Sequence, residues 1–175
     1  MSPSPTLDLR PLTGDDLDRV HELEVAASPD PWSRELLAGE LVGDRSDRHW
    51  LVALGPDRAS GGTPIIGFGG VLRVVDEAHI MNLVVEPTWR RRGVASRLLA
   101  RLLLDSGDRG AISATLEVRA SNRAAIELYR SFGFEIAGRR PRYYADDEDA
   151  EIMWCHRIDR ADRRDGFRDR GGIDD

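Results

Sequence analysis

The stretch MNLVVEPTWRRRGVASRLLARLLL, residues 81–104, decides the fold. It contains a short apolar run at residues 83–85 that ends just before Pro87, and this pattern predicts a buried strand. The leucines after Gly93 recur at the spacing of one helix face, which predicts an amphipathic helix. The stretch is therefore predicted to form a strand, a turn and a helix at the centre of the sheet.

The turn in this stretch has the features of an anion site. The first N–H groups of a helix have no partner within the helix, and the helix dipole places positive potential there. Gly93 lets the backbone approach a ligand closely, Ala95 is nearly as small, and the arginines at 90–92 add positive charge. Judged on spacing alone, an ordinary strand-to-helix unit with solvated arginines is the more frequent explanation.

Two nucleotide-binding fingerprints are missing from the sequence. It contains no G-x-x-x-x-G-K-[ST] and no G-x-G-x-x-G that opens a helix. This argues against a P-loop nucleotidase and against a dinucleotide-dependent enzyme.

Length and composition indicate one soluble globular domain. The chain has 175 residues, and no apolar run approaches the roughly 18 to 20 residues that span a bilayer. Residues 1–6 lack the basic and apolar regions of a secretory signal, so we expect a cytoplasmic protein without membrane contact.

The net charge of −6 disfavours direct binding to nucleic acid, because such domains usually carry a basic excess. An acidic surface suits a basic partner better, although charged surfaces more often serve solubility alone.

Cysteine and histidine usage gives no sign of a metal site. The single cysteine, Cys155, excludes an intrachain disulfide, and its apolar neighbours indicate a strand residue rather than a nucleophile. The four histidines are scattered without H-x-x-x-H or H-E-x-x-H spacing.

Before the central stretch, the pattern predicts a first strand at 7–10 and a helix ending at 27 whose periodic positions include Glu24. Ser33 is a suitable N-cap for a short second helix, and Trp32 before it is, on burial grounds, more often a core residue. Residues 50–54 and 65–72 predict a hairpin. Its glycines at 67, 69 and 70 mark either a bulge or a close approach of backbone or ligand.

After the central stretch, the pattern predicts a strand at 114–118, a helix capped at 121–122, a strand at 134–136 and a final strand at 151–155. From the pattern alone, Glu117 faces either solvent or a cleft, and solvent is favoured. The Arg- and Asp-rich residues 159–175 are predicted to be a disordered tail, and residues 1–6 a disordered N-terminus.

The residues Arg90-x-x-Gly93-x-Ala95 resemble the pyrophosphate motif of the GCN5-related N-acetyltransferase superfamily. The block LEVRASNRAAIELYRSFGF at 116–134 is similar to the second half of that superfamily's core almost without interruption. This resemblance implies a single α/β (α+β) domain at 7–158, with flanking helices on a mixed, mostly antiparallel sheet of about six to seven strands. It also implies that the central strand pair is splayed.

Within the superfamily, the sequence resembles the bacterial ribosomal-protein-alanine N-acetyltransferase family at 30–33, Asn82, 139–144 and 148–153. That resemblance implies acetyl-CoA as acetyl donor and the N-terminal alanine of a basic, small-subunit ribosomal protein as acceptor. Alternatives are a protein or small-amine acetyltransferase of broader specificity, and a non-catalytic acetyl-CoA-binding module. Asp30 and Pro141 depart from the family pattern, which leaves the peptide preference open.

The resemblance also implies residue roles. Glu117 would be the general base and Tyr129 the general acid, although Tyr129 can also serve simply as a core residue. A backbone N–H at 83–85 would stabilise the oxyanion. The implied acetyl-CoA contacts are Leu83, Val84, Val85, Arg91, Arg92, Gly93, Val94, Ala95, Ser96 and Asn122, of which Asn122 can also cap its helix. The implied peptide contacts are Trp32, Tyr143 and Tyr144.

Overall fold

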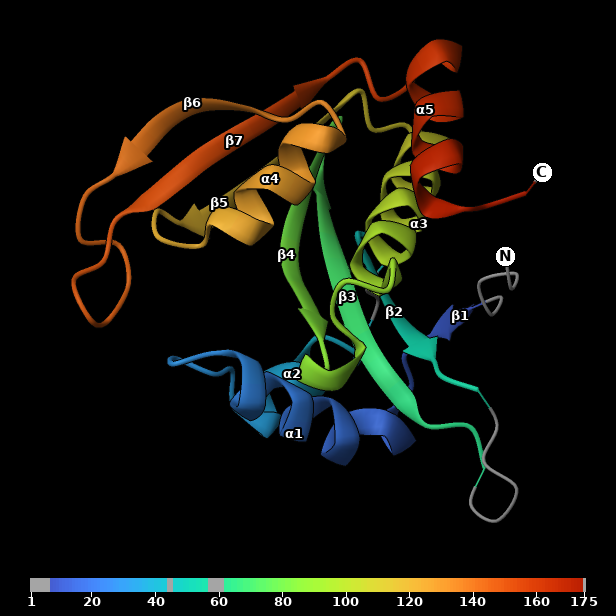
Figure 1. Cartoon of the computed structure of the whole chain (residues 1–175), viewed down its shortest axis with the longest axis vertical. Coiled ribbons are helices and arrows are strands. Elements are labelled where there is room, and N and C mark those ends of the chain that lie inside the picture. Colours follow the sequence, from blue (N-terminus) through green and yellow to red (C-terminus); the bar gives the residue numbers. More distant parts are fainter. Residues whose placement is uncertain (1–6, 44–45, 57–61, 175) are drawn as a thin grey trace.

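The computed structural model describes residues 7–43, 46–56 and 62–174, which form one seven-stranded sheet with helices on both faces (Figure 1). The strands are β1 (Asp8–Pro11), β2 (Arg48–Leu54), β3 (Ile65–Val74), β4 (Glu77–Val85), β5 (Ser113–Arg119), β6 (Glu135–Arg140) and β7 (Ala150–His156). The helices are α1 (Leu17–Ala27), α2 (Arg34–Gly39), α3 (Val94–Asp108), α4 (Arg123–Ser131) and α5 (Ala161–Gly171), with short 3-10 turns at Gly14–Asp16 and Pro87–Trp89. This architecture confirms the predicted fold class.

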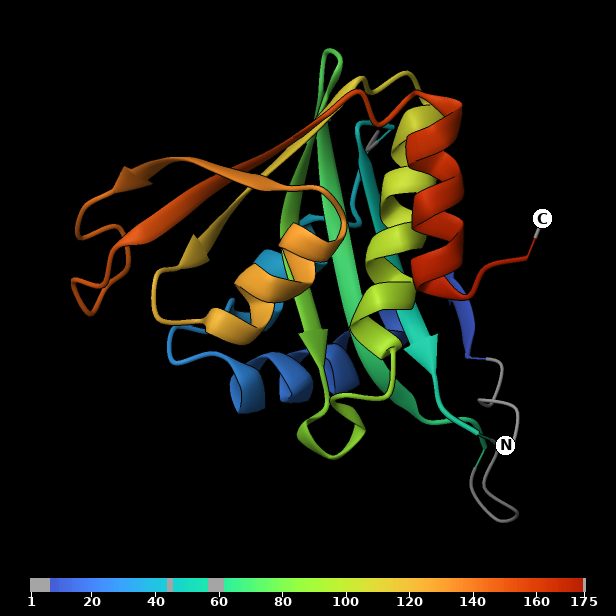
Figure 2. The same ribbon diagram turned by 45° about the horizontal axis from the view of Figure 1, so that its top comes forward.

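The strand order β1-β2-β3-β4-β5-β7-β6 is antiparallel except at its centre. There β4 and β5 run parallel and pair only from Glu77 with Ser113 to His79 with Thr115. Towards their carboxyl ends the two strands diverge, as Figures 1 and 2 show. The predicted splay of the central pair is therefore confirmed.

Two apolar clusters hold the helices to opposite faces of the sheet. On one face, Leu17, Val20 and Leu23 of α1 and Leu37 of α2 pack with the buried side of β2, β3 and β4. On the other face, the leucines of α3 pack with apolar side chains of α4 and α5. Both layers bury side chains at helical spacing, which is the pattern that the sequence carries.

The glycines of β3 allow neighbours to approach the sheet closely. A Cβ atom on Gly69 would lie 3.1 Å from a methyl group of Leu102 on α3, and one on Gly70 would overlap the Trp50 ring. The pairing of β3 with β4 also shifts by one residue between Gly70 and Val71. The register shift agrees with the predicted bulge, whereas the close neighbours at Leu102 and Trp50 are side chains rather than the backbone or ligand that the prediction named.

The predicted disordered tail is wrong for residues 161–171, which form α5. Phe167 is only 2% exposed and packs into the cluster that contains α3. Arg164 donates hydrogen bonds to the Leu104 carbonyl at 3.2 Å and to Asp108 at 2.7 Å. One well-placed aromatic residue and these charged contacts order a segment whose composition alone suggests disorder. Residues 1–6 lie outside the described residues.

The predicted strand environment of Cys155 is confirmed. It lies buried on β7, and its thiol donates to the Phe132 carbonyl at 3.6 Å. Burial raises the pKa of this thiol, which keeps it protonated.

None of the helices in the described part of the chain has the length and apolar character needed to span a membrane.

Candidate active site

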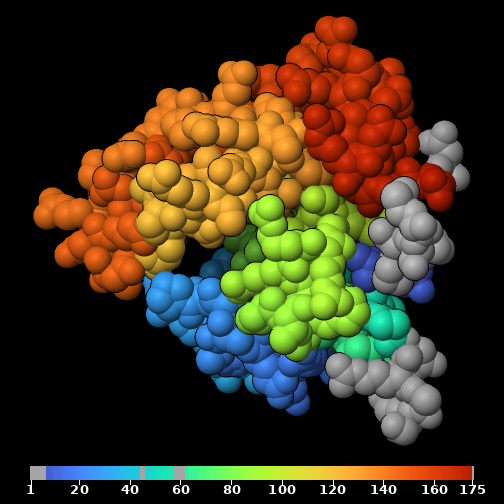
Figure 3. All heavy atoms as spheres, in the orientation of Figure 1, coloured from blue at the N-terminus to red at the C-terminus, as the bar shows by residue number. Residues whose placement is uncertain are grey.

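A cavity of about 1330 Å³ opens where β4 and β5 diverge. Its walls come from the α1–α2 loop, the turn before α3, the start of α4 and the β6–β7 loop. In Figure 3 the surface is hollowed where the blue, green and yellow-orange segments meet. The cavity brings together nearly all predicted site residues: Trp32, Leu83, Val84, Val85, Arg91, Gly93, Val94, Ala95, Ser96, Glu117, Asn122, Tyr129, Tyr143 and Tyr144.

Arg92 is the predicted contact that does not line this cavity. Its guanidinium instead stands over the Trp89 ring, 5.0 Å from the ring centroid.

The turn before α3 forms an open cradle at one end of the cavity. Gly93 caps the helix with φ of 81°, and a Cβ atom added there would meet no atom within 4 Å. Arg91 also has a positive φ, 61°, so the backbone turns sharply just before the helix starts. The free N–H groups of the first turn, the dipole of the 15-residue helix and the neighbouring arginines suit a diphosphate.

One edge of β4 faces the cavity with its backbone. The Glu86 N–H donates to Ile66 of β3 at 2.9 Å, and alternate residues of an antiparallel strand face the same partner. Val84 therefore pairs with β3, while the peptide groups of Leu83 and Val85 face the side from which β5 has diverged. The Leu83 N–H is bonded to Oδ1 of Asn82 at 3.0 Å, and the Val85 carbonyl accepts from Arg90 at 3.4 Å.

Glu117 projects from β5 into the cavity at a place that water reaches. Its side chain is 32% exposed, and Oε1 lies 3.5 Å from Nε of Arg140. The strand thus presents the carboxylate at the cleft, which is the alternative that the strand pattern alone did not favour.

Tyr129 lines the same cavity from α4 but is almost fully buried, with 8% exposure. Its ring packs edge-on against Phe134, with 5.7 Å between centroids. Burial, together with the nearby Tyr144, raises the pKa of Tyr129 well above its usual value, so its hydroxyl stays protonated near neutral pH. The core role and the donor role of this residue are therefore compatible.

Asn122 also combines two roles. Its side chain accepts a hydrogen bond from the Ala125 N–H at 3.2 Å, which caps α4, and the residue lines the cavity. The predicted compatibility of capping and ligand contact is thus geometrically possible.

Aromatic side chains wall the opposite end of the cavity. Trp32 packs edge-on against Trp50, and Tyr143 packs edge-on against Tyr144 at 5.1 Å. The guanidinium of Arg119 lies 4.0 Å from the centroid of the Tyr144 ring. Burial raises the pKa of Tyr144 to about 12, even though the Arg119 charge opposes the shift.

Glu24 is a cavity residue that the sequence analysis did not assign to the site. It is 2% exposed; Oε1 accepts the Trp32 N–H at 3.1 Å, and Oε2 accepts from Nδ2 of Asn82 at 2.9 Å. The available signal was an acidic residue at an apolar position of a helix.

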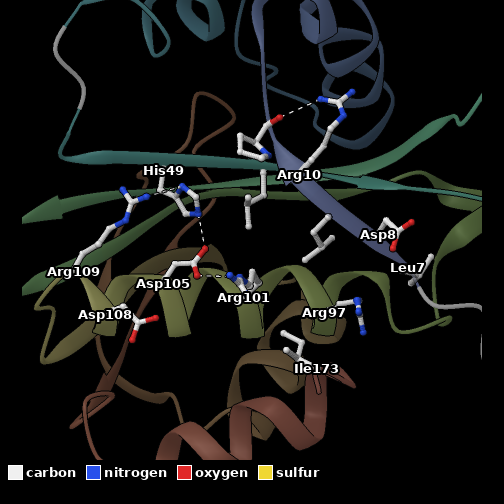
Figure 4. A pocket seen from close by; sticks show the side chains of 13 residues that line it. Leu7, Asp8, Arg10, His49, Arg97, Arg101, Asp105, Asp108, Arg109 and Ile173 are labelled. Atoms are coloured by element: carbon white, nitrogen blue, oxygen red, sulfur yellow. Dashed lines mark hydrogen bonds and ion pairs between the residues drawn. The ribbon is translucent and has the colours of Figure 1, made fainter. Parts of the chain in front are cut away.

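A second cavity of about 590 Å³ lies between β1 and α3 and contains none of the predicted site residues. Figure 4 shows His49 and Asp105 joined across it, with Nε2 and Oδ2 2.7 Å apart. Burial would raise the pKa of Asp105, but the bond to His49 and the charge of Arg101 together bring it below the usual value. These contacts tie β2 to α3. Among the described residues, no group of three or more His, Cys, Asp or Glu side chains is placed to hold a metal ion.

The fold thus has a parallel strand pair that diverges beside a glycine-containing helix start, and a carboxylate and a tyrosine line the cavity between them. The model of the acetyltransferase (GNAT) family matches residues 17–134, and the chain belongs to this family of acetyltransferases.

Three relatives show how close this membership is. The ribosomal protein bS18-alanine N-acetyltransferase of Salmonella typhimurium is 36% identical over 145 residues, which cover 81% of this chain and 92% of that protein. The N-alpha-acetyltransferase RimI of Mycobacterium tuberculosis is 37% identical over 139 residues, covering 76% and 81%. The crystal structure of the ribosomal-protein-S18-alanine N-acetyltransferase from Escherichia coli superposes with a TM-score of 0.73 at 33% identity, covering 87% of this chain and 94% of that chain.

Proposed function

We propose that this acetyltransferase transfers the acetyl group of acetyl-CoA to the α-amine of the N-terminal alanine of ribosomal protein bS18. The observation that carries the proposal is that Glu117 and Tyr129 line the same cavity as the Gly93 cradle. Two of the three relatives described above, those of Salmonella typhimurium and Escherichia coli, match over most of their length and are named for this reaction. A ribosomal substrate would place the enzyme in the cytoplasm.

Acetyl-CoA enters this cavity with its diphosphate at the start of α3. Residues 91–96 supply N–H groups and positive charge, and Gly93 leaves room for a close approach. The pantetheine arm lies along residues 83–85 like an added strand, because β5 has diverged there and leaves that edge of β4 open. Asn122 contacts the cosubstrate from the start of α4.

The reaction needs a neutral amine, and Glu117 supplies the base. A peptide α-amine has a pKa near ~7.7 to 8.0, so the carboxylate, acting through water, takes its proton. The nitrogen then attacks the thioester carbonyl, and a backbone N–H of β4 stabilises the oxyanion. The nitrogen, now bonded to the acetyl carbon, releases its second proton to solvent. The C–S bond breaks as Tyr129 donates its proton to the departing thiolate, which gives the CoA thiol, and Tyr129 takes a new proton from solvent.

The acceptor lies between Trp32 and the pair Tyr143 and Tyr144. Aromatic walls around a small apolar pocket favour alanine at the peptide N-terminus. A broader range of N-termini is the second candidate, because the exposed Asp30 lines the cavity. Such a carboxylate would accept basic residues further along the peptide.

Incubation with acetyl-CoA and a panel of peptides tests the proposal. The peptides begin Ala-Arg, Ser-Arg or Met-Arg, and a fourth has an acetylated N-terminus and an internal lysine. We expect mass spectrometry to find acetyl on the α-amine, fastest for Ala-Arg. Equal rates on the three free N-termini would favour the broader enzyme, and acetylation of lysine alone would contradict the proposal. No turnover despite acetyl-CoA binding would favour a non-catalytic module.

A further inference from the structure

The buried carboxylate of Glu24 connects the two sides of the cavity. It lies on α1 with 2% exposure and accepts one hydrogen bond on each oxygen. One donor is the backbone N–H of Trp32, on the acceptor side. The other is the side-chain amide of Asn82, on the strand that faces the thioester. Glu24 therefore bonds both to the α1–α2 loop and to β4.

Glu24 also decides which way the Asn82 amide points. Both of its side-chain oxygens accept a hydrogen bond, so the NH₂ group of Asn82 must face it. The carbonyl oxygen of Asn82 then faces the Leu83 N–H, at 3.0 Å. Asn82 lies beside the register shift of β3 and β4, where the ladder itself holds the backbone less tightly.

We propose that Glu24 is a positioning residue for acetyl transfer. Through Asn82 it fixes the Leu83 peptide of β4 beside the thioester. Through Trp32 it holds the wall of the acceptor site at a fixed position relative to that peptide. Glu24 acts through these two residues and takes no part in the bond changes. The effect on acetyl transfer rests on the proposed function. The hydrogen-bond relay, which runs from Trp32 through Glu24 and Asn82 to Leu83, rests on the contacts alone.

A pair of exchanges separates the relay from simple burial of polar groups. In Glu24→Gln, the side-chain oxygen can still accept the Trp32 N–H, but its NH₂ group then meets the NH₂ group of Asn82. Asn82 must turn over and lose the Leu83 bond. In Asn82→Asp, two carboxylates face each other. The double variant, with both exchanges, restores a donor at position 24 and an acceptor at 82, so all three hydrogen bonds form again.

Steady-state kinetics on the alanine peptide gives the first test. We expect Glu24→Gln to lower kcat about tenfold with peptide KM within about twofold, and Asn82→Asp to lower kcat about a hundredfold. The double variant should return to within about threefold of the wild type. Asp16→Asn is the matched control, because Asp16 is a buried carboxylate just before α1 that bonds Arg10 and Thr13 outside the cavity. It should lower thermal stability and leave kcat unchanged.

Amide hydrogen exchange at Leu83, followed by NMR without substrate, gives the second test. Exchange should be slow in the wild type and the double variant and faster in Glu24→Gln. If the wild type fails to acetylate the alanine peptide, the proposed function falls while this measurement still decides the relay. Unchanged kcat and Leu83 exchange in Glu24→Gln, or a double variant as impaired as Asn82→Asp, would overturn the inference.

Discussion

Glu117 is partly exposed to water and Tyr129 is almost fully buried, although the two side chains line one cavity. A solvated carboxylate can pass protons to and from bulk water. A buried phenol, whose pKa burial raises, stays protonated and is ready to donate. The environments of the two residues are therefore opposite, as the proposed roles of base and acid would require.

Glu117→Gln tests the base directly. We expect kcat/KM for the alanine peptide to fall about 100-fold near pH 7, the lower end of general-base contributions. The loss should shrink above about pH 9, because the peptide amine then loses its proton unaided. Rates measured from pH 6 to 10 decide this, with Glu135→Gln on the outer strand as the control carboxylate. A profile equal to that of the wild type would remove Glu117 as base.

The roles of single residues could be predicted only where a motif carries them. Glu117, Tyr129 and Gly93 stand in blocks that resemble a known family, and the structure brings all three to one cavity. Glu24 stands in no such block. Its partners come from the next loop and from β4, and which donors reach a buried carboxylate depends on how α1 packs on the sheet. Periodicity places a residue on a face but does not select its partners.

Among the elements, α5 shows how little apolar surface is needed to order a charged segment. Phe167 stacks on Phe132, with 6.0 Å between ring centroids, at the end of the helix that carries Tyr129. Gly171 lies where α5 crosses Ala100 of α3, and a side chain there would collide with it. Composition averages over the segment and does not detect that Phe167 and Gly171, which are four residues apart, share one helix face.

We expect Phe167→Ala to lower the free energy of unfolding by about 3 to 5 kcal/mol, because it empties a buried aromatic site. Urea denaturation followed by circular dichroism measures this. The exposed Asp169→Ala on the same helix should change stability by less than about 0.5 kcal/mol. If Phe167→Ala lost less than about 1 kcal/mol, α5 would not be part of the cooperative unit.

At the scale of the whole molecule, the cavity is polarised. The turn before α3 contributes Arg90 and Arg91. The other charged residues of the lining are three carboxylates, Glu24, Asp30 and Glu117, and one arginine, Arg119, so this part of the lining is acidic on balance. The chain as a whole also carries a net charge of −6. The overall charge could be read from composition, but the polarity could not, because it arises only when α1, β5 and the turn before α3 meet.

This polarity predicts a dependence on salt. For an alanine peptide followed by several arginines, kcat/KM should fall several-fold between about 50 and 500 mM NaCl, because salt screens long-range attraction to the acidic end. A peptide with neutral residues at those positions is the control and should change little. Equal salt dependence for both peptides would show that the acidic end does not steer the acceptor.

The divergence of β4 and β5 leaves unpaired strand edges inside a folded sheet. Exposed edges of this kind commonly recruit strands from other molecules and lead to aggregation. Here residues of the α1–α2 loop, the turn before α3 and α4 line the same cavity as the edge of β4. We expect these neighbouring segments to obstruct a second sheet, so that the opening proposed for the pantetheine arm is also guarded against edge-to-edge association.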